Sequence, residues 1–242
     1  MNLEKSLAVD PELEYLETID STNLELARRL EGSLLPDGYA IAAAAQTAGR
    51  GRLDRSWVSE PGTSISLSMF LKPAAGMEQG LIPLFFGSRV AMAVASITGQ
   101  TAAVKWPNDV LVDGRKISGV LAELGSQGVV VGVGINVERQ LGAPETSCAV
   151  SEFVSSSFDE TLSAVLGALR TGWKSWRELG NGFALSEIRA SSLTVGKEVK
   201  AILPSGEVLE GKAHAIEDDG RLLIVGEQSH LLSAADVWHL RN

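Results

Sequence analysis

A glycine- and arginine-bearing segment between two apolar runs constrains this sequence more than any other feature. The run Tyr39–Ala45 is so rich in alanine that, as a strand, it must pack closely against its neighbours. The segment Ser64–Leu71 alternates with the period of a strand. Between them lies Gln46–Trp57, called here the arginine loop, with two glycines and three arginines. We therefore expect two strands joined by this loop.

The composition of the arginine loop suits an anion. Glycines let backbone N–H groups approach a ligand closely, and guanidinium groups offer forked donors that match carboxylates and phosphates. The alternative is a solvated surface turn, because short strings of glycine and arginine also occur in ordinary loops. The loop alone does not decide between the two.

The overall composition indicates one large domain, or one domain with a small appendage. The chain has 242 residues, of which 45% are hydrophobic and 21% charged, so it is long enough to bury a real core. Its net charge of −9 argues against a nucleic-acid-binding surface spread over the whole molecule. Much of the acid excess lies in the first twenty residues. We expect residues 1–14 to be a solvated lead-in, loose or with a short helix.

Cysteine usage and hydropathy bear on the compartment. Cys148 is the only cysteine, which excludes an internal disulfide and fits a reducing environment. The start has no basic segment followed by an apolar one, as a secretory signal would. The apolar stretch 81–98 is interrupted by Pro83 and Arg89, so we expect a core helix and not a membrane span. The expected location is the cytoplasm, with no membrane partner.

Residue periodicity predicts alternating strands and helices, followed by a β-rich tail. Thr22 and Glu25 have the spacing of a capping box at the start of a helix, and Asp113-Gly114 predicts a tight hairpin turn. Beyond 192–196, short strands with glycine-based turns predict a small β-barrel. The expected strands are 15–19, 40–46, 64–71, 103–106, 110–113, 115–124, 129–137, 199–203, 208–216, 222–225 and 237–240, and the expected helices are 22–31, 80–98, 159–179 and 184–192.

The glycines of the strand 129–137 are not a nucleotide-binding signature. Gly132 and Gly134 begin a pattern whose third glycine position holds Val137, and no acidic residue follows at the expected spacing. No P-loop sequence occurs either. Glycines inside a strand more often mark a bulge or the close approach of another group.

Five stretches carry more polar and glycine residues than their secondary structure requires. Each has an ordinary structural explanation, such as an N-cap for Ser21–Asn23. In this order, however, they resemble the biotin–protein ligase family, the enzymes that attach biotin to carboxylase carrier proteins. The resemblance covers residues 15–140 by motif, and the tail fits in order and length. The stretches are Ser21–Asn23, Gln46–Trp57, Lys105–Asp109, Arg115–Gly119 and Gly132–Asn136.

The resemblance implies an α+β fold with a mixed, largely antiparallel sheet flanked by helices, a class II synthetase-like ligase core. A small C-terminal SH3-like β-barrel follows it. We place the biotin- and ATP-binding catalytic domain at 1–192 and the barrel at 193–242. The implied reaction has two steps, with ATP and biotin as substrates and Mg²⁺ as the cation. The biotin carboxylate attacks the α-phosphate of ATP, giving biotinyl-5′-AMP and pyrophosphate. A lysine of a biotin carboxyl carrier domain then attacks the mixed anhydride and releases AMP.

The resemblance also implies roles for individual residues. Biotin's ureido ring is neutral and carries donors and acceptors, so hydroxyls and amides are suited to bind it. A carboxylate and a triphosphate repel each other, so fixed cations must offset that repulsion. Lys116, Arg50 and Arg52 are the expected catalytic groups, and Gly119 is expected to leave room for the biotin bicycle. The biotin-binding set is Ser21, Thr22, Asn23, Gln46, Gly49, Arg50, Gly51, Arg52, Lys116 and Gly119, and the ATP- or adenylate-binding set is Arg50, Arg52, Arg55, Trp57, Lys105, Asn108, Lys116 and Asn136.

Two further expectations concern the metal and the loop. Asp109 is the best candidate to hold Mg²⁺, which prefers oxygen ligands, although it is equally placed to cap the turn after Pro107. The arginine loop is expected to close as a lid over the adenylate and keep water out. Asp54 stands where many relatives have glycine and is placed to pair with Arg52 or Arg55. Its effect on loop mobility stays open.

Three other functions compete with a biotin ligase. A lipoate–protein ligase is related in fold and chemistry, but the stretches Gly49–Arg52 and Lys105–Asp109 favour biotin. A non-enzymatic biotin sensor would not need the concentration of cations around Lys116. A DNA-binding regulator is disfavoured because the ligase motifs begin at Ser21 and the N-terminal segment is acidic, so we expect no repressor activity and no nucleic-acid partner. A homodimer stays open, with 128–136 as an edge strand that pairs between subunits.

Overall fold

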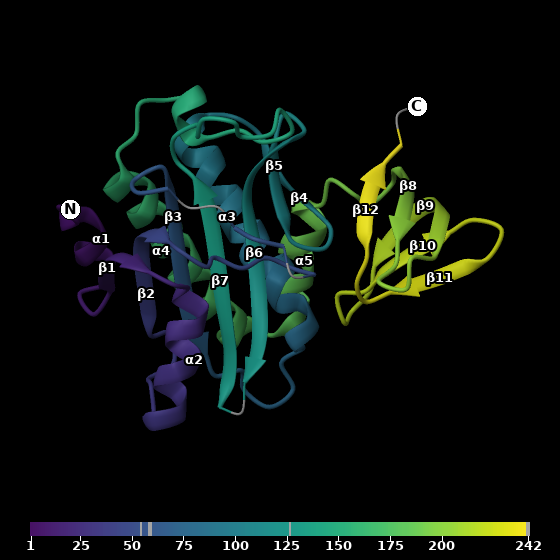
Figure 1. Ribbon diagram of the computed structural model, residues 1–242. Coiled ribbons are helices and arrows are strands. Elements are labelled where there is room, and N and C mark those ends of the chain that lie inside the picture. The colour runs from purple at the N-terminus through teal and green to yellow at the C-terminus, as the bar shows by residue number, and fades with distance from the viewer. Residues whose placement is uncertain (54, 58–59, 126, 241–242) are drawn as a thin grey trace.

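The computed structural model describes residues 1–53, 55–57, 60–125 and 127–240. These residues form two β-sheets, a large one flanked by helices and a small one near the C-terminus (Figure 1). The strands of the large sheet are joined mostly by hairpins and helices that lie on its faces. The predicted α+β class is therefore confirmed.

The large sheet contains seven strands among the described residues, in the order β1-β2-β3-β7-β6-β5-β4. Only β1 and β2 of the described pairs run parallel; the others are antiparallel. Asp113 and Gly114 have positive φ angles of 50° and 75°, as expected for a tight turn between two strands. The strands are β1 (Glu14–Ile19), β2 (Ala40–Gln46), β3 (Ser64–Leu71), β4 (Ala102–Lys105), β5 (Asp109–Val112), β6 (Arg115–Gly125) and β7 (Gly128–Asn136).

Strand β7 lies in the middle of this sheet, so the prediction that 128–136 is an edge strand open to another subunit is wrong. It pairs with β3 on one side and with β6 on the other. Both rows of its backbone hydrogen-bonding groups are thus used within the chain, and they offer nothing to a second copy. The edges of the sheet are β1 and β4.

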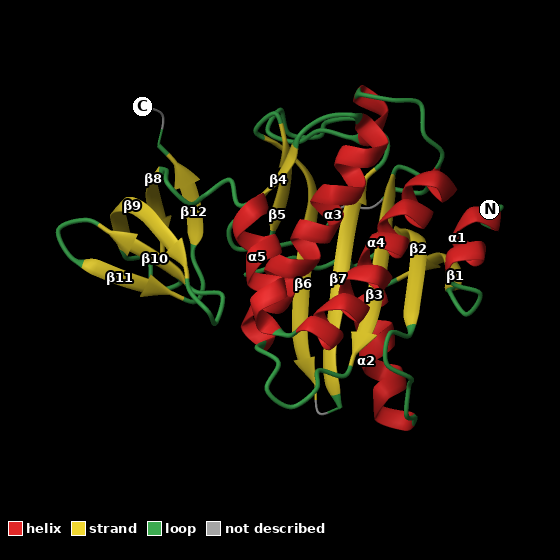
Figure 2. Cartoon of the chain, turned by 180° about the vertical axis from the view of Figure 1, so that it is seen from behind, coloured by secondary structure: helices red, strands yellow, loops and turns green. Residues whose placement is uncertain are grey.

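Helices α3 (Ile82–Thr98), α4 (Phe158–Leu179) and α5 (Asn181–Ser191) cover one face of the sheet (Figure 2). The apolar helix α3, preceded by the short 3₁₀ turn η1 (Gln79–Leu81), is long enough to cross a membrane, yet 67% of that apolar window is buried inside the fold. It is the core helix that the sequence predicts. Trp173 and Trp176 of α4 pack against Phe86 and Phe85 of α3, which confirms them as core residues. Helix α5 begins at Asn181, three residues before the predicted start.

Helix α2 (Thr22–Gly32) lies on the opposite face, over β2, β3 and β7. Alternation along β3 sends Met69 and Leu71 into the main core and Phe70 into a smaller cluster with Leu26 and Leu30 of α2. Beyond this cluster, the same face of the sheet carries small and polar residues. It therefore has room for a ligand beside the N-terminus of α2. The residues in question include Ser66 and Ser68 of β3 and Gly132 and Gly134 of β7.

The N-terminal segment is packed and not solvated, contrary to prediction. Leu3 and Ser6, at the start of helix α1 (Glu4–Val9), are buried. The Ser6 hydroxyl donates to Asp159 Oδ1 at 2.6 Å, and Asp10 pairs with Arg170 of α4. The short helix was one of the two expected forms of this segment, but it docks on α4 instead of lying in solvent.

The second sheet confirms the predicted C-terminal β module and adds one strand to it. Its strands are β8 (Glu198–Ile202), β9 (Val208–Ile216), β10 (Leu222–Val225), β11 (Ser229–Leu232) and β12 (Asp236–His239), in the order β11-β10-β9-β8-β12. Strand β11 was missed because it is short and mostly exposed. This sheet lies beside β4: Leu193 N–H donates to the Val104 carbonyl at 2.8 Å, and Trp106 Nε1 donates to the Gly220 carbonyl at 3.0 Å. The division at 192/193 stays a prediction.

Candidate functional site

A cavity of about 1240 Å³ lies between the polar face of the large sheet and the C-terminal sheet. It collects the predicted site residues from separate parts of the chain, with Gly49 and Asn136 as the exceptions. The sequence-predicted residues that line it are Ser21, Thr22, Asn23, Gln46, Arg50, Gly51, Arg52, Arg55, Trp57, Lys105, Asn108, Asp109, Lys116 and Gly119.

The N-terminus of α2 forms the neutral polar end of this cavity. Gln46 Oε1 accepts hydrogen bonds from the backbone N–H of Thr22 at 2.8 Å and from the Thr22 hydroxyl at 3.1 Å. The capping-box prediction is wrong because Ser21 holds the N-cap position and Thr22 is the first helical residue. Glu25 instead forms ion pairs with Arg28 and Arg29. The hydroxyl of Thr22 is thus turned toward the cavity wall and not toward the helix backbone.

Serine residues of β3, which the sequence reasoning did not select, complete this end. Ser68 Oγ lies 2.7 Å from Thr22 Oγ1 and donates to Asn23 Oδ1 at 2.5 Å. Ser66 also lines the cavity. The signal was present in the alternating serines of Ser64–Leu71, but alternation alone gives two faces and does not say which one meets a ligand.

The glycines of β7 allow two side chains to lie directly on the sheet. A Cβ atom at Gly132 would lie 2.4 Å from Asn23 Oδ1, and one at Gly134 would lie 2.3 Å from the indole of Trp57. Both distances are far shorter than real contacts of a Cβ atom, so neither position tolerates a side chain without a shift. The expectation that these glycines mark a close approach is confirmed.

The arginine loop folds back on itself as a tight hairpin. Gly51 N–H donates to the Arg55 carbonyl at 2.7 Å, and Trp57 N–H donates to the Gly49 carbonyl at 2.9 Å. A Cβ atom at Gly49 would lie 2.4 Å from the Trp57 carbonyl oxygen, so Gly49 has a structural role in closing the hairpin. Asp54, whose effect was left open, lies outside the described residues.

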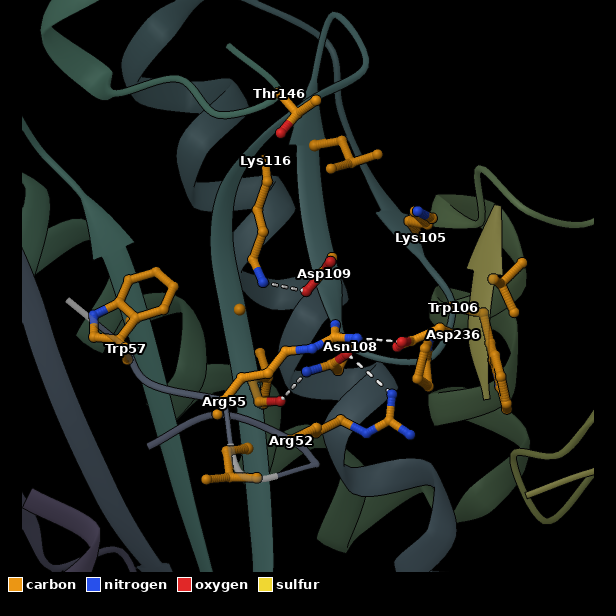
Figure 3. A pocket seen from close by; sticks show the side chains of 18 of the residues that line it. Arg52, Arg55, Trp57, Lys105, Trp106, Asn108, Asp109, Lys116, Thr146 and Asp236 are labelled. Atoms are coloured by element: carbon orange, nitrogen blue, oxygen red, sulfur yellow. Dashed lines mark hydrogen bonds and ion pairs between the residues drawn. The ribbon is translucent and has the colours of Figure 1, made fainter. Parts of the chain in front are cut away.

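The three arginines of the loop point to different partners. Arg50 forms an ion pair with Glu123 of β6 at 2.8 Å. Arg52 donates a long hydrogen bond of 3.5 Å to Asn108 Oδ1. Arg55 pairs with Asp236 of the C-terminal sheet, as Figure 3 shows. The loop therefore touches both sheets.

The cationic end of the cavity is built around Lys116 (Figure 3). Its Nζ lies 2.6 Å from Asp109 Oδ1 and 5.8 Å from the centre of the Trp57 ring system. Gly119 faces this ammonium, because a Cβ atom there would lie 3.2 Å from Lys116 Nζ. The missing side chain of Gly119 thus makes room for Lys116 itself. Space for the biotin bicycle at this glycine stays a prediction.

Burial shifts the titration of two cations at this end. It lowers the pKa of the Arg52 guanidinium, while the nearby carboxylates of Asp236 and Asp109 act in the opposite sense. It also lowers the pKa of Lys105, again opposed by Asp109. Lys105 Nζ lies 5.4 Å from the centre of the Trp238 ring system. Burial removes water from these two cations, and an anionic ligand beside them would replace the lost solvation.

Asn136 lies outside the cavity lining and braces the backbone of Lys116. Its amide donates to the Cys148 carbonyl at 3.0 Å, and Cys148 N–H donates to the Lys116 carbonyl at 2.9 Å. Lys116 N–H in turn donates to the Thr146 carbonyl at 2.8 Å. A contact of Asn136 with adenine stays a prediction. Cys148 itself is buried, which raises the pKa of its thiol.

The C-terminal sheet supplies a wall of the cavity that the sequence reasoning missed. Lys197, Lys212, Asp236, Trp238 and His239 all line it. Burial, then the charges of Lys105 and Lys197, lower the pKa of His239. The only local signal was a tryptophan between Val237 and His239 in a short strand. Which cavity that strand faces depends on how the two sheets pack.

Comparison with known proteins agrees with this geometry. Residues 15–138 match the biotin/lipoate A/B protein ligase family, and residues 194–240 match the biotin protein ligase C-terminal domain. The chain is 36% identical to the biotin–[acetyl-CoA-carboxylase] ligase of Mycobacterium tuberculosis, covering 95% of this chain and 90% of that protein. It is 31% identical to the ligase of the same name from Paracoccus denitrificans, covering 90% and 97%. The biotin protein ligase from Aquifex aeolicus in complex with biotin and ATP superposes with a TM-score of 0.79 at 30% identity, covering 96% of this chain and 99% of that one.

Proposed function

The chain belongs to the biotin/lipoate A/B protein ligase family, and from this premise we propose that it is a biotin–[acetyl-CoA-carboxylase] ligase. It activates biotin with ATP as biotinyl-5′-AMP and transfers it to a lysine of a carboxylase's biotin carrier domain. The observation that carries this proposal is the polarity of one cavity. Neutral hydrogen-bonding groups at Thr22 and Gln46 lie at one end, and cations at Lys116, Arg52 and Lys105 lie at the other.

In the activation step, a carboxylate oxygen of biotin bonds to the α-phosphorus of ATP and the bond to the pyrophosphate oxygen breaks. We assign Lys116 to the oxygens on which negative charge builds up. Its pairing with Asp109 supports this role, because that contact holds the ammonium in the cavity before substrates arrive. Arg52 is suited to the phosphates, because its desolvated guanidinium is a strong partner for an anion.

In the transfer step, the neutral amine of the acceptor lysine attacks the biotinyl carbonyl carbon. The bond to the AMP phosphate oxygen breaks, and the nitrogen loses a proton. The mixed anhydride hydrolyses if water reaches it, so the site has to be covered. The arginine loop is suited to this task because it contacts β6 through Arg50 and the C-terminal sheet through Arg55.

A magnesium ion fits this site only with help from the nucleotide. No group of three or more His, Cys, Asp or Glu residues is arranged to hold a metal within the described ranges. Asp109 offers one carboxylate, and its Oδ1 already contacts Lys116. Mg²⁺ often binds through one or two carboxylates together with substrate phosphates and water. We therefore propose that Asp109 supplies the protein ligand and that the ion reduces charge repulsion by the triphosphate.

Three further expectations remain proposals. We place the enzyme in the cytoplasm, with the carboxylase carrier domain as its macromolecular partner and without a nucleic-acid or membrane partner. A lipoate–protein ligase is the remaining rival within the family, because the matched family includes both activities.

The proposed function is tested by mass spectrometry of a purified biotin-acceptor domain after incubation with the enzyme, ATP, Mg²⁺ and biotin. Lys116→Ala is the test variant, and Lys174→Ala is the control, because Lys174 is exposed on α4 and away from the cavity. Wild type and the control are expected to add the mass of biotin. Lys116→Ala is expected to be slower by roughly a hundredfold or more, as for loss of a group that stabilises transition-state charge.

Each other outcome has a definite meaning. No mass gain with a folded wild-type enzyme and a competent acceptor refutes the biotin assignment, and the same assay with lipoate and a lipoyl domain then tests the rival. Equal gains with all three proteins keep the ligase and remove Lys116 from its assigned role.

A further inference from the structure

Glu123 of β6 has no role in the proposed reaction, yet it joins two parts of the site. Its Oε2 accepts a hydrogen bond from Asn23 Nδ2 at 2.7 Å and from the Arg50 guanidinium at 2.8 Å. Asn23 belongs to the N-terminus of α2, and Arg50 belongs to the arginine loop. One carboxylate oxygen therefore connects the helix end to the loop.

Asn23 is held in place on both sides of its amide. Its Oδ1 accepts from Ser68 Oγ at 2.5 Å, and its Nδ2 donates to Glu123. The side chain lies over Gly132, where a Cβ atom would be 2.4 Å from its Oδ1, and only 5% of the residue is exposed. An amide engaged in this way is better suited to hold a neighbour than to bind a ligand directly. Asn23 thus acts as the bridge to Glu123.

A carboxylate beside an anion-binding cavity needs an explanation, because it weakens the binding of anions. The explanation is its effect on Arg50, whose long side chain has many rotamers when free. Pairing through one guanidinium nitrogen holds this side chain against β6 and leaves the remaining donors of the fork for an anion. Arg55 meets Asp236 on the other side of the loop, so Glu123 provides the anchor on the side of the large sheet.

We propose that Glu123 is a positioning residue, which anchors the arginine loop through Arg50 to the same helix end that presents Ser21 and Thr22 to biotin. Its expected consequence, slower escape of biotinyl-5′-AMP from beneath the loop, rests on the proposed function. The anchoring itself is a property of the ligand-free protein. It is therefore measurable without biotin.

The test variant is Glu123→Gln, which keeps an acceptor for Asn23 and removes the charge that holds Arg50. The matched control is Glu187→Gln. Glu187 is exposed to a similar extent, 37% against 35% for Glu123, and neither Glu187 nor its partner Arg89 lines the cavity. Hydrogen exchange of the ligand-free proteins is followed at Gly51 and Trp57, whose amides close the loop hairpin.

Glu123→Gln is expected to speed exchange in the loop by roughly two- to fivefold. The upper value corresponds to about 1 kcal/mol, the usual limit for an exposed ion pair, at 1.36 kcal/mol per tenfold. Added salt should speed loop exchange more in wild type than in the variant, because salt screens the Glu123–Arg50 pair that the variant lacks, while the Arg55–Asp236 pair is present in both. The control variant should match wild type. Release of biotinyl-5′-AMP should accelerate by the same factor as exchange.

A second background shows whether Glu123 acts through Arg50. In the Arg50→Gln background, adding Glu123→Gln is expected to leave the rate of loop exchange unchanged. Additive effects of the two changes would overturn the proposal. Unchanged loop exchange in Glu123→Gln would also overturn it. Faster exchange over the whole large sheet, together with a lower melting temperature, would overturn it as well. If wild type forms no biotinyl-5′-AMP, the proposed function fails, while the exchange data still decide whether Glu123 anchors the loop.

Discussion

The contact between Gly134 and Trp57 gives a sharp prediction for Gly134→Ala. The added Cβ atom would lie 2.3 Å from Trp57 Cε2 and 2.5 Å from Cζ2, whereas ordinary van der Waals contact begins at 3.4 Å. An indole is rigid, and Gly134 lies in a strand paired on both sides, so neither partner yields easily. The indole has to leave the sheet, and the arginine loop has to move with it.

The size of the loss in kcat/KM follows from two states of the variant, one with the indole kept on the sheet and one with the indole and the loop displaced. Keeping the indole in place would cost about 1–3 kcal/mol, as overpacking of a tight site usually does. If the closed loop is needed for catalysis, kcat/KM falls by roughly 5- to 150-fold, at 1.36 kcal/mol per tenfold. The fold itself should not lose stability. Replacing glycine by alanine inside a strand favours folding by about 0.5–1 kcal/mol, and the loop can move away.

The assay is steady-state biotinylation of an acceptor domain, paired with calorimetric melting. Gly125→Ala is the matched control, because a Cβ atom there meets its nearest atom, the Gly128 carbonyl oxygen, at an ordinary 3.6 Å. The expected pattern is a large loss of kcat/KM in Gly134→Ala at an unchanged or higher melting temperature, with near wild-type kinetics in Gly125→Ala. A kcat/KM within twofold of wild type in Gly134→Ala would refute the steric argument.

Two other predictions concern the loop and the N-terminal helix. Arg52→Ala is expected to release biotinyl-5′-AMP about 10- to 150-fold faster, because a hydrogen bond to a charged group is worth about 1.5–3 kcal/mol; leakage equal to wild type in a chemical-trapping assay would contradict the lid. The hydrogen bond from Lys5, together with those from the backbone N–H and hydroxyl of Ser157, lowers the pKa of Glu160 from 4.5 to about 2. This contribution to stability is present above pH 4.5 and lost as the pH falls toward 2. Melting temperature should therefore fall more steeply in that range for wild type than for Glu160→Gln, and parallel curves would count against the lowered pKa of Glu160.

Much of the fold could be predicted because its signals are local. The alternation of Ser64–Leu71, the turn at Asp113-Gly114 and the apolar periodicity of the helix 159–179 each lie within one stretch of chain. The errors came where packing overrides composition. The acidic N-terminal segment docks on α4 through Ser6, and Thr22 turns its hydroxyl to Gln46 and not to its own helix.

The residues of the candidate site also fall into those that local sequence reveals and those that only tertiary contacts reveal. Its cations and polar residues were found because they cluster in short stretches, and the cavity gathers nearly all of them. Glu123, Ser68 and Asp236 were missed, since each meets a site residue that is far away in the sequence. Asn136 belongs to a stretch that resembles the family's site, yet its amide donates to the Cys148 carbonyl and does not line the cavity.

The sequence by itself determined most of the segments that form strands and helices, the position of the cations in the arginine loop, and the β-rich module that follows the main domain. These properties depend on backbone propensity and residue type within a few positions. Only the tertiary structure decided that β7 is central, that Gly134 supports Trp57, and that the C-terminal sheet forms a wall of the cavity. The reason is that each of these is a contact between residues distant in the chain, and contacts of this kind arise from packing and leave no periodicity in the sequence.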